Sequence, residues 1–458
     1  MEFRNLTPFD ALCFSALDVE DREHRVIAMK VGYRLVRREG SNFEAVAIDD
    51  EPVPLCMADE YVGEVGESSV REESDLAPYK PRCDVMLRGM AYAPGGVAAP
   101  HWAVRIRVSE PVPEAEVSVD GPHPLAPGMA LNERQREELA TARADAERRR
   151  SEASRVRPLF DKILRVTGPR QFQRDFLTLW RGWRLTKPEA AATVTMNWEH
   201  AFGGRSVVPN PEHKRNAEQP EHLLNEVCFS NPLGRGWVDQ RYFRQLGKAG
   251  QARPTSLPAP QIESADVPVQ RLMFCKHPNG NPNAAQMAGI ARNYGAAPAG
   301  FGVVGRAWAP RLAQAGSYDD AWLKNRWPYL PKDFDFGYWN AAPADQQVSY
   351  LSPVARIELW NLVEPSSTTN GYVSVALPGH RPFVLMRFDN GYMLPFRMVL
   401  DTVVIDTERM VIACTYRIRI PSDAPVRVVE ARYEVDANAP LVAPPSEEPS
   451  VVTGEETV

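Results

Sequence analysis

The chain has 458 residues, 44% of them hydrophobic, which is an ordinary composition for a globular protein with a proper core. Its 53 lysines and arginines nearly balance 59 aspartates and glutamates, so the net charge is −6. A nucleic-acid binder needs a concentrated basic face, and this balance gives no support for one. The composition therefore predicts a globular protein that does not bind nucleic acid.

The N-terminal residues show no secretion signal. The first apolar run, residues 11–17, is short and is followed by Asp18, Glu20 and Asp21. No window reaches the ~18 uninterrupted apolar residues of a membrane span. The six cysteines lack the spacing of a metal site and stand at Cys13, Cys56, Cys83, Cys228, Cys275 and Cys414. We therefore expect reduced, mostly buried thiols, a cytoplasmic location and no membrane insertion.

Residues 1–185 are predicted to form an N-terminal β region. From Ile27 to Leu35 every second side chain is apolar, the period that buries one face of a sheet, and the side chains between, including Lys30, are expected on the polar face. Residues 104–108 alternate in the same way. Turns rich in proline and glycine separate these segments, which favours a meander or half of a sandwich.

A charged segment at about residues 131–157 interrupts this β region. Asn132 and Gln135 resemble a capping box, and Asp145 and Arg149 form an acid-to-base pair four residues apart. The segment has almost no large apolar side chains, so it cannot bury the wide stripe of a core helix. We predict a long charged helix that lies on or projects from the surface; the alternative is a docking arm for a partner.

Residues 186–350 are predicted to form a loop-dominated central region rich in tryptophan, glycine and proline. Nine of the ten tryptophans fall between Trp180 and Trp360. Residues 279–283 have turn chemistry. A short helix is expected after Ser317 as its cap, and Pro328 should end it.

Residues 351–437 are predicted to form a C-terminal β region. Asn390 and Gly391 are the strongest short hairpin signal, and they lie between expected strands at 383–388 and 392–399. Pro395 should sit on an edge strand or at a bulge. Further strands are expected at residues 403–407, 410–420 and 426–435, with Arg417 and Arg419 on the polar face of the second.

Residues 438–458 lack apolar periodicity, which predicts a disordered acidic tail. The fold class that we expect is mainly β (α+β). It has antiparallel, sandwich-like sheets in the N- and C-terminal parts, a loop-rich aromatic centre and one long charged inserted helix.

Two blocks of the central region, residues 197–204 and 231–237, place large rings beside glycines. Glycine reaches positive φ and so holds an irregular loop in one conformation, from which rings can be presented to a partner. The alternative is that the rings pack the interior. The candidates for partner-binding or motif-loop residues are Trp198, Phe202, Gly203, Gly204, Asn231, Gly234, Gly236 and Trp237.

Asp333 and Asp335 complete the candidate site residues. In an extended strand their carboxylates lie on one face, as a hard metal or a glycosidic site would require. The pattern lacks the glycine and the later glutamate of a calcium loop. The alternative is that both carboxylates stabilise a loop by accepting backbone N–H bonds.

Other catalytic patterns are missing from the sequence. The histidines never form a zinc-binding pair, and no nucleophile elbow or phosphate loop occurs. The glycines of residues 300–305 have the wrong spacing for a dinucleotide loop. We therefore predict no catalytic residue, no metal ligand and no cofactor.

Several blocks, in this order, together resemble a known bacterial family. They are residues 74–84, 89–94, 197–204, 231–237, 300–302, 317–335 and 340–346. The family is the type VI secretion accessory family, long catalogued as domain of unknown function 2169. The resemblance covers residues from about 8 to 435.

The resemblance implies a cytoplasmic adaptor or chaperone, not an enzyme, that binds a type VI effector and helps load it onto the spike proteins VgrG and PAAR. The family commonly runs from its N-terminal strands directly into a Val-x-Gly-x-Arg block, here residues 166–170. In this chain the charged helix precedes that block, so residues from about Ser109 to Lys162 resemble an elaboration of one strand connection. We expect this insertion on the surface and hypothesise that it confers cargo selectivity.

Two other functions stay open at this point. A protein that binds or cleaves cell-wall glycan would use Asp333, Asp335 and the tryptophans. An immunity protein would block a toxin and take no part in its delivery.

Overall fold

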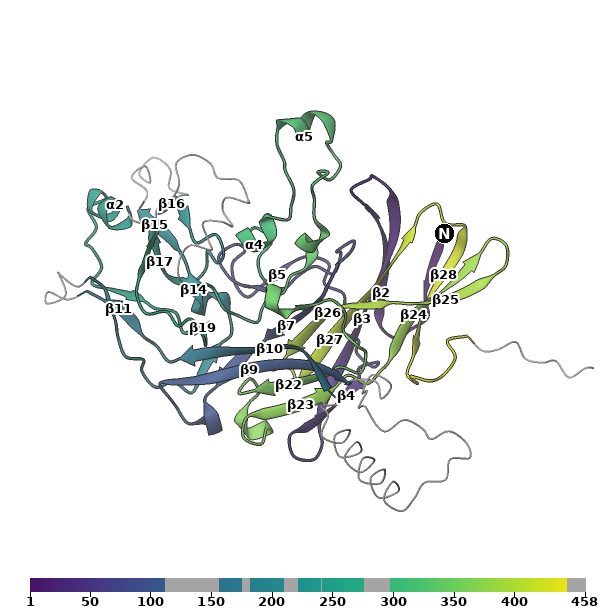
Figure 1. Ribbon diagram of the computed structural model, residues 1–458, viewed down its shortest axis with the longest axis horizontal. Coiled ribbons are helices and arrows are strands. Elements are labelled where there is room, and N and C mark those ends of the chain that lie inside the picture. Colours follow the sequence, from purple (N-terminus) through teal and green to yellow (C-terminus); the bar gives the residue numbers. More distant parts are fainter. Residues whose placement is uncertain (112–155, 175–181, 210–220, 240, 276–296, 443–458) are drawn as a thin grey trace, which may run out of the picture.

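A computed structural model describes residues 1–111, 156–174, 182–209, 221–239, 241–275 and 297–442. Strands make up most of its regular structure, and the helices are short (Figure 1). The prediction of a mainly β fold is confirmed. No helix in these ranges is long and apolar enough to cross a membrane.

The largest sheet has 12 strands among the described residues, in the order β19-β10-β9-β22-β23-β4-β3-β27-β26-β7-β21, with β2 paired to β3. The bounds are β2 (Asp10–Leu17), β3 (Glu23–Arg37), β4 (Asn42–Ala47), β7 (Cys83–Arg88), β9 (His101–Pro111), β10 (Val156–Thr167), β19 (Ile262–Ser264), β21 (Gln347–Val348), β22 (Arg356–Trp360), β23 (Tyr372–Ala376), β26 (Val399–Asp406) and β27 (Val411–Pro421). Strands from both ends of the chain pair here, β3 with β27 and β7 with β26. The regions 1–185 and 351–437 thus share a sheet, and their limits as domains stay a prediction.

A second sheet has four strands, β1 (Glu2–Asn5), β28 (Val426–Glu434), β24 (Arg381–Phe388) and β25 (Met393–Arg397), in that order. The predicted hairpin at Asn390 and Gly391 joins β24 to β25 and is confirmed. Gly391 has a φ of 87°, which suits this residue type in a tight turn. Pro395 lies on the edge strand β25, as expected. The predicted strand 392–399 is too long, because Val399 begins β26.

The central region consists of short elements joined by loops. Its short strands are β13 (Thr193–Thr195), β14 (Phe202–Gly203), β15 (Arg205–Pro209), β16 (Glu221–Val227), β17 (Arg235–Asp239), β18 (Ser256–Pro258) and β20 (Met273–Cys275). Three short strands from the N-terminal region join them: β8 (Met90–Tyr92) pairs with β13, and β11 (Gln171–Gln173) pairs with β18 and with β12 (Arg184–Leu185). Its helices are η4 (Trp198–His200), α2 (Tyr242–Lys248), α4 (Ala309–Leu312), α5 (Asp320–Asn325), η5 (Phe336–Trp339) and η6 (Ala344–Gln346). Elsewhere lie β5 (Glu60–Tyr61), β6 (Val70–Glu72), η1 (Pro94–Gly96) and η7 (Pro365–Ser367).

The helix predicted after Ser317 exists, but the expected cap is wrong. The carboxylate of Asp319 accepts a bond from the Trp322 backbone N–H at 2.8 Å and caps α5. Ser317 is engaged elsewhere, because its hydroxyl donates to Asp333 at 2.7 Å. The helix ends before Pro328, as predicted.

The predicted charged helix at residues 131–157 lies outside the described residues, apart from its last two positions. These two, Val156 and Arg157, open strand β10, so the predicted boundary there is wrong. Strands β9 and β10 pair with each other, with Pro111 opposite Val156. The ends of the expected insertion, Ser109 to Pro111 and Val156 to Lys162, therefore belong to paired strands. The turn at 279–283 and tail residues 443–458 are also outside the described ranges.

The sheet is covered on the face that the alternation predicted to be polar. Lys30 is 2% exposed and Arg417 is 5% exposed, so the expected exposure of these two residues is wrong. Residues 69–80, here called the crossing segment, supply their partners. Asp75 accepts a bond from Lys30 at 2.7 Å, and its backbone carbonyl accepts one from Arg417 at 2.7 Å. Long-range ion pairing thus buries charges that a period of two would leave in water.

Candidate functional site

The two glycine-containing blocks, residues 197–204 and 231–237, pack against each other. This contact is here called the joint. Strand β14 pairs in parallel with β17, and Gly203 lies opposite Gly236. Asn231 is fully buried, and its Nδ2 donates to the carbonyls of Trp198 at 2.9 Å and Phe202 at 3.0 Å. One asparagine amide therefore holds the first block against the second.

The glycines are required where the two backbones come close. Gly203, Gly204 and Gly236 have φ values of 150°, 134° and 95°, so the predicted positive φ is confirmed for these three. A Cβ on Gly203 would lie 2.1 Å from the Asn231 carbonyl oxygen. At Gly234 it would lie 2.6 Å from the Ala201 carbonyl oxygen. The joint leaves no room for a side chain at these positions.

The rings of the two blocks lie in the interior. Trp198, Phe202 and Trp237 are 5%, 0% and 4% exposed. The Trp198 indole donates to the Val303 carbonyl at 2.7 Å and packs edge-on against Trp308, with ring centroids 5.5 Å apart. These rings contact the core and cannot meet a partner directly in this conformation. They shape the joint.

Asp84 links two further blocks of the family resemblance. Its buried carboxylate accepts bonds from Lys80 Nζ at 2.9 Å, Asn340 Nδ2 at 3.1 Å and the backbone N–H groups of Ala341 and Ala342 at 2.8 and 3.1 Å. Burial alone would lower the pKa of Lys80, but attraction to Asp84 and other carboxylates raises it above its usual value. Asp84 was not among the residues predicted for the site, and its only signal in the sequence is its place at the end of the block 74–84.

Asp333 and Asp335 both stabilise loops. Asp333 accepts bonds from the Ser317 backbone N–H at 3.0 Å and from its hydroxyl, and these bonds lower the pKa of the Asp333 carboxyl. Asp335 accepts a bond from the Gly337 N–H at 2.8 Å and caps η5. No group of three His, Cys, Asp or Glu side chains among the described residues is placed to hold a metal ion.

The described thiols are free, and most are buried. Cys56, Cys83, Cys228 and Cys414 lie in the interior, and Cys13 is half-buried. Burial raises the pKa of Cys228 to about 12, so its thiol is protonated near neutral pH. These cysteines therefore pack as small apolar side chains.

A projecting arm, residues 316–335, carries several exposed rings of the central region, with α5 at its tip (Figure 1). Four large side chains of the arm are exposed: Tyr318, Leu323, Trp327 and Tyr329. Trp327 is 66% exposed. The half-buried Trp322 ring packs edge-on against Tyr318 and Trp327, at centroid distances of 4.7 and 5.6 Å. The rings thus support one another while facing solvent.

The arm is fixed to the turn between β2 and β3 by residues that follow α5. Two guanidinium nitrogens of Arg326 each donate to one carboxylate oxygen of Asp21 at 2.7 Å. Lys332 Nζ donates to the Val19 carbonyl at 2.8 Å. A groove of about 360 Å³ lies between this turn and the arm, lined by Leu17, Tyr329 and their neighbours. The arm therefore presents its rings from a held position.

A larger groove of about 610 Å³ lies at the start of the arm, where Pro310 and Gln314 line it together with Lys162 of β10. Lys162 Nζ donates to the Gly300 carbonyl at 2.9 Å and to Asp345 at 2.8 Å. Burial lowers the pKa of Lys162, although Asp345 raises it in part. The exposed surface of the arm was not predicted, although the dense aromatic residues of the block 317–335 are a signal for it.

The joint also contains a group that should respond to pH. His200 Nδ1 lies 2.9 Å from Gln261 Oε1, and burial lowers the pKa of His200 below its usual value near 6.5. As pH falls through about 6.5 the unfolded chain binds a proton more readily than the folded chain, so stability is lost. We expect the loss of unfolding free energy between pH 7.5 and 5.5, measured in urea, to be smaller in His200→Gln than in the wild type. Equal losses of unfolding free energy in the wild type and in His200→Gln would show that His200 is not the group responsible for this pH dependence.

The comparisons with known proteins place the chain in one family. The family's sequence profile matches residues 20–142 and 138–417. No curated protein and no solved structure matches the chain. Since the two matched segments span most of its length, the chain belongs to the family described as uncharacterized protein conserved in bacteria (DUF2169).

Proposed function

We propose that this protein is a cytoplasmic adaptor that binds a type VI secretion effector and helps load it onto the VgrG and PAAR spike, with no reaction of its own. The observation that carries the proposal is the arm of residues 316–335. Its exposed Trp327, Tyr318 and Tyr329 are of the residue types that dominate protein–protein binding energy. An exposed apolar cluster of this kind marks an interaction site.

The construction of the arm favours tight binding. Rings that are already held by one another, and by the ion pair of Arg326 with Asp21, lose little conformational freedom when a partner docks. The groove at the start of the arm and the groove between the arm and the β2–β3 turn offer room for partner side chains. If the protein binds the folded effector and not the unfolded one, it also raises the apparent stability of the effector by mass action. In this sense the adaptor acts as a chaperone.

The hydrogen bonds of Asp333 and Asp335 favour a function in protein binding over one in catalysis. Asp333 and Asp335 already accept loop hydrogen bonds, from Ser317 and Gly337. The exposed rings meet edge-on, with interplanar angles of 71° between Tyr318 and Trp322 and 88° between Trp322 and Trp327. Tryptophan and tyrosine are enriched among the residues that dominate protein–protein binding energy, which favours a protein partner for the arm.

We expect Trp327→Ala to weaken effector binding about 30-fold, roughly 2 kcal/mol, because truncating a central aromatic anchor costs this much. The melting temperature should change little, since the side chain is 66% exposed. Co-expression with the products of neighbouring genes, affinity capture and size-exclusion chromatography identify the effector, and calorimetry then measures its affinity. The matched control is Tyr392→Ala, which removes a 69% exposed ring on the β24–β25 hairpin.

Other results of these experiments would contradict the adaptor proposal or favour a different function. Capture of no neighbouring product would contradict the adaptor function, and equal affinity in Trp327→Ala would exclude the arm as its interface. Binding of muropeptide that is lost in Trp327→Ala would favour glycan recognition. A complex that inhibits the toxin without supporting its secretion would identify an immunity protein.

A further inference from the structure

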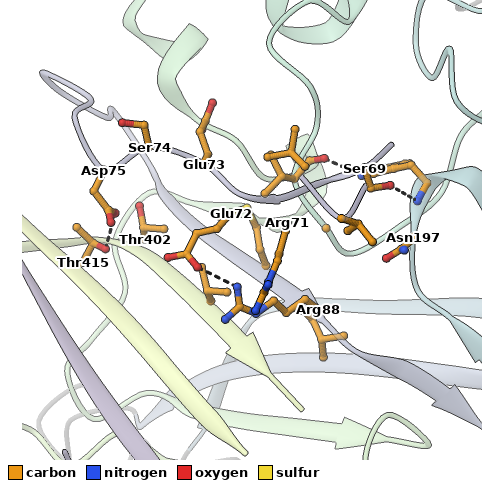
Figure 2. Close-up of a pocket in the computed structure, with 18 of the residues that line it drawn as sticks. Ser69, Arg71, Glu72, Glu73, Ser74, Asp75, Arg88, Asn197, Thr402 and Thr415 are labelled. Carbon is orange, nitrogen blue, oxygen red and sulfur yellow. Dashed lines mark hydrogen bonds and ion pairs between the residues drawn. The ribbon is translucent and has the colours of Figure 1, made fainter. Parts of the chain in front are cut away.

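A small cavity lies beneath the crossing segment (Figure 2). Its volume is about 60 Å³, enough for a few water molecules or a group of similar size, and too small for a sugar or a nucleotide. One part of its wall is apolar and consists of Met86, Met196, Val303 and Val404. The other part carries charged side chains from the crossing segment and from the sheet.

Almost all of these charges are matched by partners. Glu72 accepts bonds from Lys30 and from Arg88, the latter at 2.9 Å. Lys80 pairs with Asp84 at 2.9 Å. Glu73 and Asp75, on the same segment, are also paired, with Arg311 at 2.8 Å and with Lys30 at 2.7 Å. These groups neutralise one another and need no ligand.

Arg71 is the exception among the cationic groups that line the cavity. It forms no hydrogen bond or ion pair with any residue that the structure describes, and it is exposed. Figure 2 draws Arg71 among the residues that line the cavity. A guanidinium group that no carboxylate of the described residues neutralises is suited to binding an anion.

Asn197 supplies a second free donor at the same cavity. Its side-chain amide lines the cavity and has no hydrogen-bond partner among the described residues, whereas its backbone carbonyl accepts a bond from the His200 N–H at 3.1 Å. Asn197 opens the first glycine block, and the joint described above leaves its amide unused. An arginine fork and an amide N–H are both suited to the oxygens of a carboxylate.

We propose that this cavity binds a carboxylate carried on a short aliphatic stem. The guanidinium of Arg71 binds the two oxygens, the Asn197 amide donates a further bond, and the apolar wall contacts the stem. The carboxylate belongs either to a small free acid or to an aspartate or glutamate of a partner protein, which present the same chemistry. The test of this site does not depend on the proposed adaptor function, because it uses the isolated protein without an effector.

Calorimetric titration with propionate, in a low-salt buffer free of other carboxylates, tests the site. We expect saturable one-to-one binding of propionate, no binding of the uncharged propionamide, and much weaker binding of benzoate, which is too large for the cavity. Arg71→Gln should weaken propionate binding at least about tenfold, and Arg71→Lys less, because it keeps the charge and loses the fork. Arg34→Gln is the matched control, since Arg34 is also exposed and unpartnered among the described residues but lies outside the cavity.

A blocked Gly-Glu-Gly peptide distinguishes the two sources of the carboxylate. If the peptide competes with propionate, the site accepts an acidic side chain of a partner; if only propionate binds, it takes a small acid. Absence of saturable propionate binding would overturn the proposal. So would unchanged affinity in Arg71→Gln, once circular dichroism and the melting temperature show that this variant is folded.

Discussion

Replacing Asp84 with alanine is expected to reduce the free energy of unfolding by about 4 kcal/mol, the usual cost of breaking a buried ion pair from one side. The change removes the carboxylate that accepts bonds from Lys80, Asn340, Ala341 and Ala342. It leaves the Lys80 ammonium, 5% exposed, without its nearest counter-charge. Two buried backbone N–H groups also lose their acceptor, which adds to the cost. Urea unfolding measures the loss.

Two controls separate burial of charge from loss of any ion pair. Asp84→Asn keeps the shape and one acceptor oxygen but loses the charge, so its cost should lie between those of the wild type and the alanine variant. Asp161→Ala breaks the ion pair between Asp161, 34% exposed, and Arg105, 32% exposed. Its cost in unfolding free energy should be less than about 1 kcal/mol. A cost for Asp84→Ala as small as that for Asp161→Ala would contradict its role as the link between motif blocks.

Gly203→Ala is expected to destabilise the protein by about 3 kcal/mol or more. The added Cβ would lie 2.1 Å from the Asn231 carbonyl oxygen, so the joint between β14 and β17 must open. A φ of 150° adds strain for a residue with a side chain. Because Asn231 holds both blocks, we also expect weaker effector binding through loss of the fold around Trp198.

Gly250→Ala provides the comparison for strain alone. Gly250 also has a positive φ, of 73°, but a Cβ there would have no atom of the described residues within 4 Å. Its substitution should cost about 1 kcal/mol, the usual penalty of the left-handed region. If both glycine variants unfold at the same urea concentration, the close approach at Gly203 is not what requires a glycine.

Local patterns predicted several of the longer strands, among them β3, β9, β27 and β28, and the reason is physical. A period of two reports which residues share one face of a strand, and this depends only on neighbouring residues. The hairpin at Asn390 and Gly391 is equally local, because the turn needs residues that reach positive φ. Pro395 on the edge strand follows from its missing N–H. These elements could be predicted because their causes lie within a few residues.

The burial of Lys30 and Arg417 could not be predicted in this way. The partner of Lys30, Asp75, is 45 residues away, and the same aspartate accepts a bond from Thr415 across 340 residues. An alternating strand with a lysine looks the same whether or not an acidic segment crosses it. Only the path of the crossing segment over the sheet decides that these charges are buried.

For the candidate site too, some features could be predicted from the sequence and others depend on the tertiary structure. The sequence by itself determined which positions need glycine and which blocks belong together, because positive φ and motif order are properties of short stretches of chain. Only the tertiary structure decided that Trp198, Phe202 and Trp237 pack inward while Trp327 faces solvent, since exposure depends on what packs against each ring. It likewise decided that Arg71 has no partner among the described residues, because the acidic groups around the cavity are already paired with other cations.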